Sequence, residues 1–150
     1  VPPPTYVKGA GFEEGVLVDR WQEFEYVVPS TVIQWTGALE EGRNAMENRE
    51  QNGGFNLRLY HGATPKTESS CYYFWTPLNG YKPRDSEATK VLHKEIAATF
   101  NEDLDFLESQ QACMATTMDQ LFVDIKHDSA RIPARRAIEN MIKRELNENV

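Results

Sequence analysis

Polar and apolar residues alternate along much of the first half of the chain, whereas apolar residues recur every three or four positions in the second half. Alternation with β-branched and aromatic residues is typical of half-buried strands, and it predicts strands at 16–28, 31–36, 55–61 and 69–76. The polar segment 64–68 is predicted to be the turn of a hairpin, and the glycine-containing segment 40–54 an exposed loop.

The helical pattern begins near residue 85. One face of a long helix, about 85–115, carries Ile96, Phe100, Leu107 and Met114, and Asp85 or Ser86 can cap its first turn. A last helix is predicted to begin near Pro133, with an apolar side formed by Ala137, Ile138, Met141 and Ile142. With 1–15 as an irregular lead-in and 116–132 unassigned, residues 1–150 are expected to form one α+β domain, an antiparallel sheet followed by helices.

Composition narrows the classes of function. The net charge of −7 and the scattered basic residues argue against nucleic acid and against an anionic membrane surface as partners. No apolar run approaches the roughly 18–20 residues that span a bilayer, and no signal peptide is visible. The two cysteines, Cys71 and Cys113, have neither metal-type spacing nor a disulfide framework, so a cytoplasmic location is expected.

Asp103 interrupts the apolar stripe of the long helix. It occupies a position between Phe100 and Leu107 where the pattern asks for an apolar residue, so the carboxylate is expected to face the core. A carboxylate in that position needs an ion pair, a hydrogen bond or a bound cation. Spacing alone leaves open a structural aspartate satisfied by a backbone amide or an arginine, and a metal ligand.

His61 and Gln34 are the candidates for ligand binding. His61 ends the row Phe55, Leu57, Leu59 on the inward face of a strand, so it is either a hydrogen-bonded core histidine or a group that contacts a ligand. Gln34 interrupts an apolar strand and could reach the same cavity, although a glutamine at a sheet edge explains it as well. The remaining histidines, His93 and His127, lie in polar surroundings and are expected to be solvated, and the aromatic run 72–75 is expected to serve packing.

Two segments resemble a known family. Residues 61–75, HGATPKTESSCYYFW, and residues 100–111, FNEDLDFLESQQ, are similar to a hairpin and a helix of the vanillate and dicamba O-demethylase branch of Rieske non-heme iron oxygenases. Shorter similarities lie at 19–22, at 29–32, after Gly37, and at 128–136. Lys66 departs from the family, which usually has glutamate there.

The resemblance implies a helix-grip fold, in which a curved antiparallel sheet wraps a long helix around a cavity. It implies a mononuclear iron(II) held by two histidines and one carboxylate, with Asp103 at the carboxylate position and His61 at a position that hydrogen-bonds the substrate. It further implies an aromatic substrate, dioxygen, electrons from NAD(P)H through a reductase and a [2Fe–2S] cluster, and a homotrimer. Hydroxylating a methoxy carbon gives a hemiacetal that loses formaldehyde, hence O-demethylation.

The family's two histidine ligands and its iron–sulfur domain have no counterpart in this sequence. The start at Val1 followed by Pro2–Pro4 is expected to be that of a piece of a longer protein, the C-terminal part of a catalytic domain that is inactive alone, with no complete catalytic set. Two other functions remain open: a metal-free helix-grip carrier of a hydrophobic small molecule, and a structural or oligomerisation module.

Overall fold

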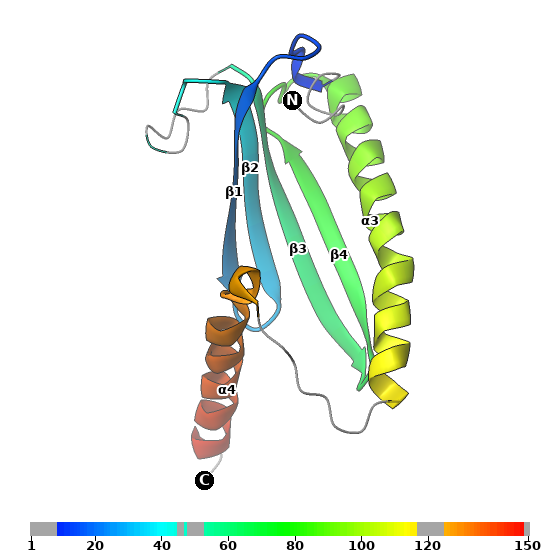
Figure 1. The fold of residues 1–150 in the computed structure, drawn as a ribbon. Coiled ribbons are helices and arrows are strands. Elements are labelled where there is room, and N and C mark those ends of the chain that lie inside the picture. Colours follow the sequence, from blue (N-terminus) through cyan, green and yellow to red (C-terminus); the bar gives the residue numbers. More distant parts are fainter. Residues whose placement is uncertain (1–8, 45–46, 48–52, 117–124, 149–150) are drawn as a thin grey trace.

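The computed structural model describes residues 9–44, 47, 53–116 and 125–148. Strands β1 (Val18–Val27), β2 (Thr31–Glu40), β3 (Phe55–Thr67) and β4 (Ser70–Asn79) precede helix α3 (Ser86–Thr116). The short 3-10 helix η1 (Lys126–Asp128) and helix α4 (Arg131–Glu148) follow. Figure 1 shows a twisted sheet with α3 running alongside it, which confirms the predicted α+β class and agrees with the helix-grip arrangement.

The four strands form one antiparallel sheet in the order β1-β2-β3-β4. The predicted hairpin is confirmed, but the predicted turn at 64–68 is wrong. β3 continues to Thr67 through an irregularity between Pro65 and Thr67, and only Glu68 and Ser69 form the turn. Pro65 fits within the strand because β2 pairs with β3 only as far as Gly62, so the missing N–H of Pro65 leaves no ladder hydrogen bond unmade on that side. β2 also runs beyond the predicted residue 36, to Glu40.

The main core lies between α3 and one face of the sheet. Phe55, Leu57 and Leu59 alternate along β3 and are 1%, 5% and 4% exposed, as their spacing predicts. Leu92 of α3 packs into the same cluster, and Ile96 and Phe100 extend the contact along the helix. Burial of these side chains is what fixes α3 to the sheet.

The opposite face of the sheet carries a smaller cluster. Trp21 and Leu39 are buried there, with Trp35 packed beside them, and the two indole rings meet edge to face at 6.1 Å. A Cβ at position 37 would lie 2.1 Å from Cζ2 of Trp21, so only glycine lets the indole lie flat over β2. This packing is independent of α3.

The predicted cap of α3 is confirmed, because Oδ1 of Asp85 accepts hydrogen bonds from the amides of Glu87 and Ala88, both at 3.0 Å. The predicted burial of its whole apolar stripe is wrong. Ile96 and Phe100 pack on the core, but Leu107 is 56% exposed. All residues of α3 from 101 to 113 are exposed, and Met114, the last residue of the predicted stripe, is half-buried.

Helix α4 includes Pro133 in its first turn, as predicted. Part of the predicted apolar side is half-buried, while Ile142 is 51% exposed. No described helix is long and apolar enough to cross a membrane.

Candidate functional site

Three adjacent strands bring Gln34, His61 and Tyr73 together. His61 pairs directly with Val32 on β2 and with Trp75 on β4, so Gln34 and Tyr73 are its diagonal neighbours on the same face. Nδ1 of His61 lies 2.5 Å from the hydroxyl oxygen of Tyr73, and Nε2 lies 3.2 Å from Oε1 of Gln34. The sheet register therefore places one imidazole between two polar side chains.

The chemistry of these partners assigns the hydrogens. An amide oxygen can only accept, so Nε2 of His61 carries a hydrogen and donates it to Gln34. Burial lowers the pKa of His61 below its ordinary value, which favours the neutral ring. Nδ1 of a neutral ring then accepts, and the hydroxyl of Tyr73 donates to it. Burial, and secondly the charge of Asp103, raise the pKa of Tyr73, which keeps its phenol protonated.

A dependence of stability on pH follows from the lowered pKa of His61. Between that lowered pKa and the ordinary value of about 6.5, the unfolded chain binds more protons than the folded one, so acidification favours unfolding. We expect the free energy of unfolding to fall as the pH drops below about 6.5, and to fall less steeply in His61→Gln. Urea denaturation at several pH values measures both slopes, and parallel curves for the two proteins would contradict the assignment.

Aromatic rings surround the imidazole. The ring of Phe100 on α3 lies 5.8 Å from that of His61 and 5.9 Å from that of Tyr73, and it meets Trp75 edge to face at 5.2 Å. His93, predicted to be solvated, is exposed but stacks on Trp75 at 4.7 Å. The hydrogen-bonded trio therefore lies against an aromatic wall shared by β4 and α3.

Asp103 lies one turn after Phe100 on α3. Its side chain is exposed, so the expectation of a core-facing carboxylate is wrong for this chain. Its charge nevertheless contributes, after burial, to the raised pKa of Tyr73. Asp103 forms no hydrogen bond or ion pair with the residues that the structure describes, so the structural-aspartate alternative has no support among them.

The structure thus brings together residues that the sequence singled out separately. Gln34 lies on β2, between β1 and β3, so its explanation as a sheet-edge residue is wrong. Tyr73 is not among the predicted site residues, because the aromatic run 72–75 is predicted to serve packing. Counting alternate residues from Trp75, which faces His61 across the hairpin, would have placed Tyr73 on that face. The side chain of His127 lies outside what the structure describes.

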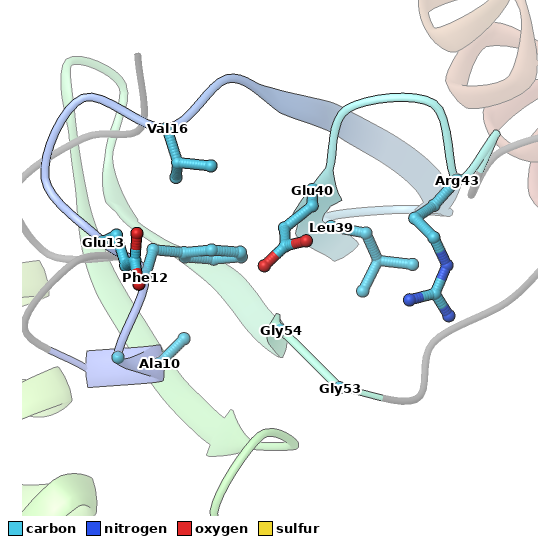
Figure 2. A pocket seen from close by; sticks show the side chains of 10 residues that line it. Ala10, Phe12, Glu13, Val16, Leu39, Glu40, Arg43, Gly53 and Gly54 are labelled. Carbon is cyan, nitrogen blue, oxygen red and sulfur yellow. The ribbon is translucent and has the colours of Figure 1, made fainter.

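A separate pocket of about 580 Å³ opens where β2 ends and β3 begins. Figure 2 shows Phe12, Leu39, Glu40 and Arg43 around it. None of Gln34, His61, Tyr73 and Asp103 lines this pocket, which lies at the start of β3, whereas His61 is at the middle of the strand. The pocket therefore does not belong to the candidate site.

Comparison with known proteins identifies the class. Residues 1–144 match the family described as the vanillate O-demethylase oxygenase C-terminal domain, and the chain belongs to that family. The fold is thus that of an oxygenase C-terminal domain. No solved structure matches the chain.

Individual relatives carry the same kind of name. The vanillate O-demethylase oxygenase subunit of Pseudomonas sp. (strain ATCC 19151) is 28% identical over 93% of this chain and 42% of its own length. The subunit of that name from Pseudomonas sp. (strain HR199 / DSM 7063) is 26% identical over 93% of this chain and 39% of its own. The oxygenase component of a chloroacetanilide N-alkylformylase from Rhizorhabdus wittichii (strain DC-6 / KACC 16600) is 30% identical over 85% of this chain and 36% of its own length. The chain spans about two-fifths of the length of these relatives.

Proposed function

We propose that the chain is the C-terminal part of the catalytic domain of a Rieske-type oxygenase, which hydroxylates or O-demethylates an aromatic substrate. The observation that carries the proposal is the Gln34–His61–Tyr73 trio packed against Phe100 of α3, with Asp103 one helical turn further along the same helix. Membership of an oxygenase C-terminal domain family over residues 1–144 supports it. The chain is proposed to be inactive without the rest of the protein.

Asp103 is proposed as the carboxylate ligand of a mononuclear iron(II). The residue fits this role because its exposed carboxylate has no hydrogen-bond or salt-bridge partner among the described residues. The described part of the chain contains no group of three or more His, Cys, Asp or Glu side chains that could hold a metal. Two histidine ligands would therefore come from elsewhere in the whole protein and complete a 2-His-1-carboxylate set. When bound, such an iron supplies the activation of dioxygen.

His61 and Gln34 are proposed to orient the substrate. The amide of Gln34, held by His61, offers a hydrogen bond without a net charge, and Phe100 and Trp75 supply flat apolar surfaces beside the imidazole. An aromatic ring with an oxygen-containing substituent matches this combination, because the ring packs on the apolar wall while the oxygen accepts a hydrogen bond. We therefore propose that these residues bind and orient the ring beside Phe100, one helical turn before Asp103 on α3.

The remaining partners are proposed from the family. A [2Fe–2S] cluster in another domain of the whole protein, and a reductase that draws on NAD(P)H, would supply electrons. Dioxygen is the co-substrate, the assembly is proposed to be a homotrimer, and the location cytoplasmic.

The test is product formation by the whole protein. With a reductase, NADH and 3-methoxybenzoate we expect formaldehyde and 3-hydroxybenzoate in air and neither product under nitrogen. The alternative hypothesis, a metal-free carrier, predicts that the protein contains no mononuclear iron, binds the aromatic acid and forms no product. That result, obtained with a reductase shown to reduce the cluster, would overturn the oxygenase proposal for this substrate class.

A further inference from the structure

Both ring nitrogens of His61 are occupied within the protein. Nε2 donates to Oε1 of Gln34, and Nδ1 accepts from the hydroxyl of Tyr73. A neutral imidazole has one donor and one acceptor in the ring plane, so this ring has no further hydrogen bond to give to a ligand. His61 therefore acts on a ligand through its neighbours as long as the trio is intact.

The hydrogen-bond donor that remains available to a ligand at the site is the amide nitrogen of Gln34. Its oxygen is held by His61, so the NH₂ group at the other end of the same amide has two hydrogens to give. This nitrogen has no hydrogen-bond partner among the described residues and is not buried. An amide fixed in this orientation presents a donor, and an amide turned over would present an acceptor.

We propose that Tyr73 is a positioning residue for substrate binding. Its hydroxyl holds His61 in the Nε2–H tautomer, His61 holds the oxygen of Gln34, and the NH₂ group of Gln34 is thereby presented to an oxygen acceptor, such as a carboxylate, on the aromatic substrate. This inference deepens the proposed function and rests on it. It assigns the direct polar contact to Gln34 and an indirect role to both His61 and Tyr73.

The hydroxyl of Tyr73 favours the Nε2–H tautomer because a phenol donates a hydrogen bond more readily than it accepts one, whereas the Gln34 amide can meet either tautomer by turning over. Without that hydroxyl the preference is lost. The neutral imidazole of His61 then exchanges its hydrogen between the two nitrogens, and the Gln34 amide can turn over to donate to Nε2. The phenyl ring of a Tyr73→Phe variant keeps the contacts with Phe100 and His61, whose ring centroids lie 5.9 and 6.1 Å away. The substitution therefore removes one hydrogen bond while it preserves the packing.

The test is equilibrium binding of 3-methoxybenzoate to the whole protein by calorimetry, which needs no turnover. Gln34→Met, similar in length but without the donor, is expected to raise Kd about tenfold, the effect of one charge-assisted hydrogen bond. Tyr73→Phe is expected to raise Kd about fivefold. Because Tyr73 acts through Gln34, the double variant should bind about tenfold weaker and no more.

The control is Tyr72→Phe, which removes the same hydroxyl from the adjacent residue of β4, on the opposite face, where Lys66 lies over the ring at 5.2 Å. It should leave Kd unchanged. The proposal is overturned if the two losses multiply to about fiftyfold, if Tyr73→Phe binds like the unmodified protein, or if the unmodified protein does not bind the probe. Binding that follows the expected pattern without any turnover would instead contradict the oxygenase proposal and leave the positioning role intact.

Discussion

Asp103→Asn is expected to remove the mononuclear iron from the whole protein and to lower oxygen-dependent turnover by more than about 100-fold, since loss of an outer-shell partner alone costs about 10–100-fold. A neutral amide is a weaker ligand than a carboxylate, and it no longer balances the charge of the metal. The exposed position of Asp103 makes unfolding an unsuitable explanation for such a loss. Iron analysis and formaldehyde release from 3-methoxybenzoate measure the two effects.

A matched control comes from the same helix. Asp105→Asn removes the same charge from an exposed carboxylate two residues further along α3, where the helical period turns it to a different face. It should retain iron and turnover, and the absorbance of the iron–sulfur cluster should be the same in both variants. Full retention of mononuclear iron in Asp103→Asn would exclude this residue as a ligand.

The fold was predictable where the pattern depends on local sequence. Alternation along Phe55, Leu57 and Leu59 gave the buried face of β3, and Asp85 gave the start of α3 through its capping chemistry. The turn was misplaced because Pro65 and its polar neighbours have the composition of a loop. A bulge lets the same residues continue a strand, and a bulge depends on the pairing with β4 rather than on composition.

The site was predictable residue by residue but not as a unit. Helical spacing directed attention to Asp103, and strand alternation to His61, yet neither pattern contains the distance between them. A prediction of burial from helical periodicity also assumes that other residues cover the apolar stripe along the whole length of the helix. In α3 that holds from Leu92 to Phe100 and fails at Leu107, where the described chain has no second layer. Tyr73 became visible only through the register that places it beside His61.

Leu92→Ala is expected to destabilise the protein by about 2–5 kcal/mol, the usual cost of truncating a fully buried leucine. Leu92 is 1% exposed and is the buried residue of α3, where it packs with Phe55, Leu57 and Leu59. Because Leu92 anchors the helix that also carries Phe100 and Asp103, its loss weakens the attachment of the proposed site to the sheet. Urea denaturation followed by circular dichroism measures the change in the free energy of unfolding.

A leucine-to-alanine substitution further along α3 distinguishes the loss of packing against the sheet from an effect of the substitution on helix propensity. Leu104→Ala removes the same atoms from a side chain that is 50% exposed, and alanine favours a helix at least as well as leucine, so a cost below about 1 kcal/mol is expected. Equal losses at the two positions would show that a layer outside this chain covers the second half of α3 as closely as the sheet covers the first. In that case Asp103 would be buried in the whole protein. A buried carboxylate requires a metal ion or another partner to balance its charge, whereas the exposed carboxylate of this chain is stabilised by water.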